Sequence, residues 1–200
     1  MTDRPAPGPD SPRPGEHVCI FYRGQDERDR LLSACLRNGL RAGHACLCVG
    51  DSADNADVLS TVTGTGQRMS TVDVVMDRPP RAGLRAVAPG PILGRIRDWL
   101  RLTFERDRCC VGRVVADMNW LFPMSSRPSL DDLVDYEAGV TASAQAYPNS
   151  VICLYDMDRC ASVAYAVIKA HSRVCMDGVT MDNPYSRDID SHRAVLSEVI

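Results

Sequence analysis

Apolar residues in this chain follow two patterns, short continuous runs and longer stretches with helical spacing. The runs predict buried strands at residues 17–22, 44–50, 71–76, 111–118, 149–155 and 173–181. Between the runs, apolar residues recur every three or four positions and predict helices at residues 26–40, 54–63, 91–106, 130–146, 162–171 and 191–199. Strands that alternate with helices favour a parallel sheet that is covered on both faces. We therefore predict a three-layer α/β/α domain with a mostly parallel central sheet.

Length and composition fit a single domain. The chain has 200 residues, 44% of them apolar, which is enough for a full-sized core. Residues 1–15 are polar and rich in proline, so we expect a disordered tail followed by one domain at residues 16–200. No apolar run approaches a membrane span and no signal peptide opens the chain, so we expect a cytoplasmic protein. A net charge of −3 opposes direct binding of nucleic acid.

The turn after the first predicted strand lies where a phosphate-binding loop would lie, but it lacks the residues that such a loop needs. A phosphate loop needs several glycines, whose backbone N–H groups approach the anion, and a lysine. Here the turn contains Gly24 and is followed by Asp26 and Glu27, which repel phosphate. Similarly, the apolar run that ends at Asp117 resembles a Walker B strand, but a Mg²⁺ ion there has little to do without a phosphate partner. The pattern indicates a degenerate nucleotide site.

Polar and aromatic residues follow several of the predicted strands, at the edge where open α/β sheets bind ligands. We predict that an anion pairs with the arginine, that aromatic rings stack on an apolar body, and that carboxylates accept hydrogen bonds. The alternative is that these side chains cap helices and close turns. We predict no catalytic residues, and the candidate ligand-binding residues are Tyr22, Arg23, Asp51, Asp117, Trp120, Tyr155 and Asp156.

Nine cysteines are many for a chain of this length. No CxxC pair is present, and most of the cysteines lie inside apolar strand or helix patterns, where a thiol behaves as a small hydrophobe. We therefore expect no cofactor, although a metal or redox site built from cysteines stays open as an alternative. His17, His44 and His171 lie at the boundaries of predicted elements and are interpreted as structural, and His192 lies in the tail.

Six segments, in order along the chain, together resemble one family. They are residues 17–51, RVVADMNW at 113–120, DYEAGV at 135–140, VICLYDMDRC at 151–160, AHSRVCMDGV at 170–179 and NPYS at 183–186. They resemble the MEDS family, a sensory domain first defined in a methylotroph dichloromethane-responsive regulator, over about residues 16–185. The resemblance implies a fold related to the RecA/KaiC core without its phosphate-binding loop, and a sensory role in bacterial signal transduction.

The resemblance favours a non-catalytic sensory or regulatory domain that binds a small ligand, a partner protein, or both. MEDS relatives are often joined to kinase-type ATPase, PAS or DNA-binding domains, for which this chain has no room. We therefore expect the output to pass through a signalling partner, namely a kinase, a sigma-factor regulator or a transcription factor; self-association stays open. Two alternatives remain: a nucleotide-binding protein with a non-standard loop, and a cysteine-based redox or metal sensor.

Overall fold

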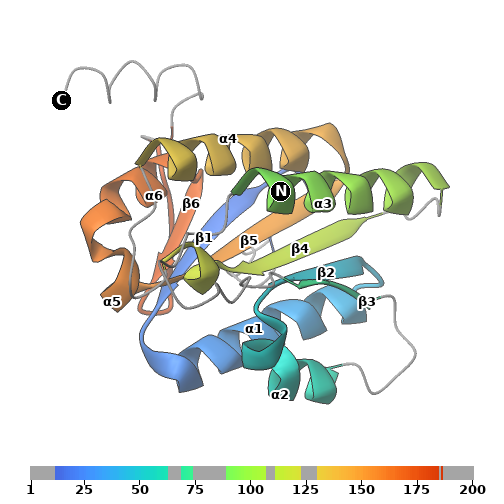
Figure 1. The fold of residues 1–200 in the computed structure, drawn as a ribbon, viewed down its shortest axis with the longest axis horizontal. Helices are drawn as coiled ribbons and strands as arrows, with labels where there is room; N and C mark the ends of the chain where they lie inside the picture. Colours follow the sequence, from blue (N-terminus) through green and yellow to red (C-terminus); the bar gives the residue numbers. More distant parts are fainter. Residues whose placement is uncertain are drawn as a thin grey trace, which may run out of the picture.

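In the computed structural model, a sheet of seven strands lies between two layers of helices (Figure 1). The structure describes residues 12–62, 69–73, 89–106, 111–122, 130–184 and 186. Within them the strand order is β3-β2-β4-β5-β1-β6-β7, and every neighbouring pair is parallel except β6 and β7. The predicted α/β fold with a mostly parallel sheet is confirmed. The strands are β1 (His17–Tyr22), β2 (Ala45–Gly50), β3 (Met69–Asp73), β4 (Gly112–Asp117), β5 (Asn149–Asp156), β6 (Arg173–Met176) and β7 (Val179–Asp182).

The helices divide between the two faces of the sheet (Figure 1). One face is covered by α1 (Gly24–Arg41) and α2 (Ser52–Val62), and the other by α3 (Pro89–Arg101), α4 (Leu130–Ala146) and α6 (Ala164–Ala170). Shorter helical segments are η1 (Leu102–Arg106), η2 (Met118–Leu121), α5 (Met157–Cys160) and η3 (Ala161–Val163). Among the described helices, none is long and apolar enough to cross a membrane.

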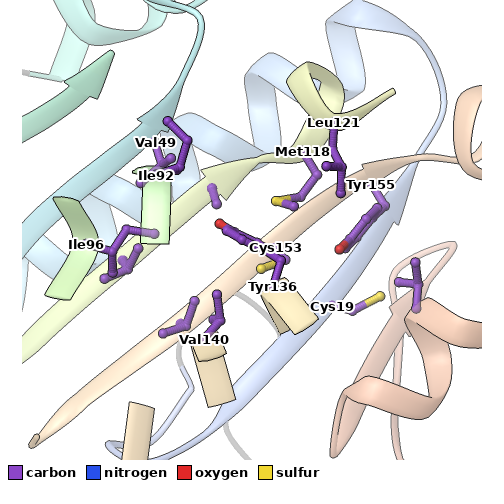
Figure 2. Packing of buried hydrophobic residues seen from close by; sticks show 14 of the residues in the cluster. Cys19, Val49, Ile92, Ile96, Met118, Leu121, Tyr136, Val140, Cys153 and Tyr155 are labelled. Atoms are coloured by element: carbon purple, nitrogen blue, oxygen red, sulfur yellow. The ribbon is translucent and has the colours of Figure 1, made fainter. Parts of the chain in front are cut away.

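Alternation along the strands sorts the interior into two separate cores. Successive side chains of a strand point to opposite faces of the sheet. In β1, Ile20 and Tyr22 therefore pack in the core below α1 and α2, whereas Cys19 and Phe21 pack in the core below α3, α4 and α6. Figure 2 shows the second core, where side chains of β1 and β5 meet side chains of α4. Residues that neighbour each other in one strand thus lie in different environments.

One sequence expectation needs correction. Residues 173–181 were predicted as one strand, but β6 and β7 form an antiparallel hairpin. Asp177 and Gly178 turn the chain with φ of 51° and 75°, which suits the type I′ turn that an Asp-Gly pair favours. The helix predicted at 162–171 corresponds to α6, which begins two residues later, after the short segments α5 and η3.

Some expectations fall outside the described residues. They concern the helix at 191–199, Cys109 and Cys110, and most of the proline-rich tail. Of that tail, residues 12–15 are described, and the Gly15 N–H donates a hydrogen bond of 2.7 Å to the carbonyl of Asn149.

Candidate functional site

Asp117 ends β4 at the carboxyl edge of the sheet, and both of its carboxylate oxygens are hydrogen-bonded inside the protein. Oδ2 accepts from Nε and Nη2 of Arg28 at 2.9 and 2.7 Å. Oδ1 accepts from the Tyr22 hydroxyl at 3.3 Å and from the Asn119 N–H at 3.2 Å, the second bond being the N-cap of η2. Each oxygen therefore accepts two hydrogen bonds from the chain itself.

Arg28 of α1 is the cation that neutralises Asp117, and its side chain has no exposed surface. Its five N–H groups all have acceptors. Besides the two bonds to Asp117, Nη1 donates to Asp29 Oδ1 at 2.6 Å and to the Asp54 carbonyl at 2.9 Å, and Nη2 donates to Asn55 Oδ1. Burial lowers the pKa of this guanidinium, but the charges of Asp117 and Asp29 outweigh burial and raise it overall, so Arg28 stays charged.

Glycine at the end of β2 allows this network to form. A Cβ atom at Gly50 would lie 2.6 Å from Nδ2 of Asn55, which is closer than side-chain atoms can pack. Tyr22 closes the network from β1, and its pKa is raised by burial and by the nearby carboxylate of Asp117. We call Tyr22, Arg28, Asn55 and Asp117 the arginine cluster. Its members come from β1, α1, α2 and β4.

Of the seven residues predicted to bind a ligand, the structure brings Tyr22 and Asp117 into contact. Arg23 is exposed and its Nη1 lies 3.5 Å from Asp158 Oδ1. Asp51 accepts a hydrogen bond from the Ala53 N–H at 2.8 Å, and Asp156 caps α5 by accepting from the Asp158 N–H at 2.9 Å. Two of the predicted carboxylates therefore do form the turn and cap contacts that the alternative interpretation expected.

The two remaining predicted residues lie in the core on the other face of the sheet. Trp120 is buried, with its ring edge-to-face on Tyr136 at a centroid distance of 5.4 Å. The Tyr155 side chain lies in the same core as Cys153 and Cys19 (Figure 2), whereas Asp117 contacts Tyr22 and Arg28 of the α1 face. Neither aromatic ring therefore shares a lining with the arginine cluster.

Arg28 and Asn55 were missed by the sequence analysis, although Arg28 carried a signal. It precedes Leu32 and Leu36 by four and eight positions, so it lies on the apolar stripe of α1, where a charged residue needs a buried partner. Asn55 carried no such signal, because its role depends on how α2 packs beside α1.

A second polar group lies within the core below α4 and α6. Glu137 Oε2 is 3.2 Å from His17 Nε2 and 3.3 Å from His171 Nε2, and His17 Nε2 is also 3.3 Å from Cys153 Sγ. All four side chains are buried, and their nearest polar atoms lie within 4.8 Å of one another. We call these residues the His–Glu–Cys group. They come from the start of β1, from α4, from β5 and from the C-cap of α6.

Burial sets the protonation of this second group. It raises the pKa of Glu137 to about 8, although a hydrogen bond from Tyr155 opposes the shift. It lowers the pKa of His171 to about 4, and it also lowers the pKa of His17 well below its usual value. Both imidazoles are therefore neutral, and their contacts with Glu137 are not ion pairs. The interpretation of these histidines as boundary residues overlooked their convergence.

The seven described cysteines are all buried and none forms a disulfide. Burial raises the pKa of Cys48 to about 12 and that of Cys160 to about 11. Since the thiolate is the reactive form, these thiols are poorly suited to fast redox chemistry.

A shallow groove between α1 and α2 contains none of the predicted site residues. Its volume is about 450 Å³, and its lining is mixed in charge, with Arg30, Arg37, Asp29 and Asp57 among the residues.

The structure is that of an α/β domain in which Asp117, at the carboxyl edge of the sheet, is hydrogen-bonded by the protein's own groups. A family model described as MEDS, the MEthanogen/methylotroph, DcmR Sensory domain, matches residues 16–172, which is most of the chain. The chain therefore belongs to the MEDS family, as its sequence motifs indicated, and has a sensory role in signalling. A search of curated proteins gives no match.

The arginine cluster makes a prediction about stability. Arg28→Met should lower the free energy of unfolding by about 3–5 kcal/mol, because it leaves the Asp117 carboxylate buried without a cation. The double variant Arg28→Met/Asp117→Leu should be less destabilised than the sum of its single variants by about 2–3 kcal/mol. Urea unfolding of the four proteins measures this coupling.

The matched control is the exposed pair Arg23 and Asp158, whose side chains are 63% and 74% exposed. The same cycle with Arg23→Met and Asp158→Leu should give a coupling energy below about 1 kcal/mol. Equal coupling energies in the two cycles would show that the Arg28–Asp117 pair is exposed to solvent like the control pair.

The buried thiols make a second prediction. In a Cys109→Ser/Cys110→Ser variant, which leaves the seven described cysteines, we expect native protein to react with a disulfide reagent far more slowly than unfolded protein. Absorbance of the released thiolate follows the reaction. A thiol that reacts fast in the native state would contradict this and favour a cysteine-based redox sensor.

Proposed function

We propose that this chain is a non-catalytic sensory domain of bacterial signal transduction that acts by binding a small ligand, a partner signalling protein, or both. The proposal includes a relation of its core to RecA and KaiC, with the nucleotide site lost. The order of β1, its turn and α1, and the apolar strand β4 that ends in Asp117, support this relation.

Saturation of Asp117 is the observation that carries the non-catalytic part of the proposal. A Mg²⁺ ion binds through oxygen lone pairs. Both oxygens of Asp117 already accept two hydrogen bonds each, and the neighbouring charge of Arg28 repels a cation. The carboxylate that would hold the metal ion of a nucleoside triphosphate is therefore already engaged in hydrogen bonds within the protein.

The first turn of α1 supports the same conclusion. A phosphate at this position would use the free N–H groups at the start of the helix. Glu27 Oε2 already accepts from the Arg23 N–H at 2.8 Å, and Asp26 adds a second negative charge to the first turn. The helix start is thus supplied with carboxylates of its own, which disfavour phosphate.

Recognition is proposed at the exposed rim of the carboxyl edge. Arg23 and Asp51 follow β1 and β2, and Asp156 ends β5; the parallel directions of these strands bring their ends to the same edge, where Arg23 is exposed and the two carboxylates are partly exposed. Arg23 is suited to an anionic group, and the two carboxylates can accept hydrogen bonds. The buried predicted residues, Tyr22, Asp117, Trp120 and Tyr155, would support this rim from beneath rather than touch the ligand.

The signal would leave the domain through a partner. A ligand shifts a binding equilibrium only if it interacts differently with the free and the bound states. We therefore propose that occupation of the rim changes the affinity for a kinase, a sigma-factor regulator or a transcription factor.

Thermal unfolding tests the proposal, because any ligand of the native state raises the melting temperature. Millimolar ATP with Mg²⁺ should leave it unchanged. In a screen of small anionic and polar metabolites, at least one should raise it, and Arg23→Ala should weaken that effect without changing the melting temperature of the free protein. The exposed Arg30→Ala, on the groove between α1 and α2, is the matched control.

Stabilisation by ATP together with release of phosphate would contradict the proposal and favour a nucleotide enzyme with a non-standard loop. A ligand effect that Arg30→Ala removes and Arg23→Ala leaves intact would move recognition from the rim to the groove.

A further inference from the structure

The hydrogen bonds of Thr141 indicate which ring nitrogen of His17 carries the proton. The Thr141 hydroxyl donates its only hydrogen to the Glu137 backbone carbonyl at 3.0 Å. Its oxygen therefore accepts the hydrogen bond of 2.9 Å that joins it to His17 Nδ1. With the proton on Nδ1, the neutral ring presents a lone pair at Nε2, and this atom faces Glu137 Oε2 and Cys153 Sγ.

His171 has the same tautomer for a separate reason. Its Nδ1 lies 2.7 Å from the backbone carbonyl of Val167, which can only accept, so Nδ1 carries the proton. Its Nε2 lone pair then points to Glu137 Oε2 at 3.3 Å. Neither His171 Nε2 nor Glu137 Oε2 has a hydrogen-bond partner within the described residues, although both are buried.

Lone pairs of two imidazoles thus converge on one carboxylate oxygen. A proton on Oε2 can be donated to one ring, which leaves the other ring facing an oxygen lone pair at 3.2 or 3.3 Å. The other carboxylate oxygen, Oε1, accepts from the Tyr155 hydroxyl. A buried cation placed among the Nε2 atoms of the two histidines, Glu137 Oε2 and Cys153 Sγ would use every one of these lone pairs.

The distances fit a tetrahedral ion. Zinc bonds of about 2.0–2.3 Å place neighbouring ligand atoms about 3.3–3.6 Å apart. Three of the separations in the His–Glu–Cys group are 3.2, 3.3 and 3.3 Å, and none exceeds 4.8 Å. Small side-chain rotations would therefore complete a four-ligand site.

The surroundings of the two histidines are those that metal ligands need. A metal-bound imidazole commonly donates its second N–H to a carbonyl or another acceptor, which fixes the ring and its tautomer. Thr141 and the Val167 carbonyl take this role here, and Tyr155 does so for the carboxylate of Glu137.

We propose that His17, Glu137, Cys153 and His171 bind one divalent transition-metal ion, with Zn²⁺ best matching two imidazoles, one carboxylate and one thiolate. Zn²⁺ would replace the proton of Glu137 and the proton of Cys153, so the charge of the buried site is unchanged. Four protein ligands and complete burial make this a closed, structural site. It would join β1, β5, α4 and α6, and the ion would enter as the chain folds.

The proposal does not depend on the ligand or partner of the sensory domain. The alternative is a neutral network, in which the Cys153 S–H donates to His17 and a protonated Glu137 donates to His171. The two differ in composition, because the network contains two protons where the site contains a metal ion.

Elemental analysis of the full chain, purified without chelator or a histidine tag, tests the proposal. We expect one equivalent of metal per chain, and loss of that metal in His171→Ala and Cys153→Ser. Cys48→Ser is the matched control, since Cys48 is also a buried strand cysteine but lies in the core on the opposite face. This variant should retain the metal.

Refolding with Co²⁺ keeps the test valid if a variant folds poorly. Wild-type protein refolded from denaturant with Co²⁺ should show the absorption bands of a tetrahedral ion with a thiolate ligand, and its unfolding midpoint should rise. One equivalent of another first-row metal would support the site and correct the ion. Absence of metal with no effect of Zn²⁺ or Co²⁺ on stability, or metal retained in both ligand variants, would overturn the proposal in favour of the neutral network.

Discussion

The buried ion pair between Arg28 and Asp117 connects the elements that meet at the carboxyl edge of the sheet. A charge in the interior is costly unless it is paired and hydrogen-bonded. Arg28 therefore needs β4 for Asp117 and α2 for the Asp54 carbonyl and Asn55, while Asp117 also accepts from β1 through Tyr22. The position of α1 over the sheet is fixed by these contacts as well as by its apolar stripe.

The same pair determines what the edge can do. In a nucleotide enzyme, a carboxylate at the end of a strand keeps lone pairs for a metal ion, and the adjoining turn offers N–H groups to phosphate. In this chain the Asp117 carboxylate has internal partners, and Asp26 and Glu27 place carboxylates of their own at the start of α1. The recognition that we propose at the exposed rim is consistent with the sensory role of the MEDS family.

Much of the fold could be predicted from the sequence, since the apolar runs and helical stripes reflect burial directly. The candidate site was harder to predict. Period-two alternation separates Tyr155 from Tyr22 and Asp117, although all three lie near strand ends. The His–Glu–Cys group was not predictable from spacing, because its members come from four elements that only tertiary packing brings together. The Asp177-Gly178 turn, in contrast, did carry a local signal.

NMR of the arginine side chains tests most directly whether the carboxyl edge is closed. If Arg28 holds Asp117 in solution, its Nε–H will exchange with water far more slowly than that of the exposed Arg23, and its chemical shift will not move in excess ATP and Mg²⁺. Fast exchange at Arg28, or a shift of its resonance when nucleotide is added, would show that the edge opens and that Asp117 is available to a metal and its nucleotide.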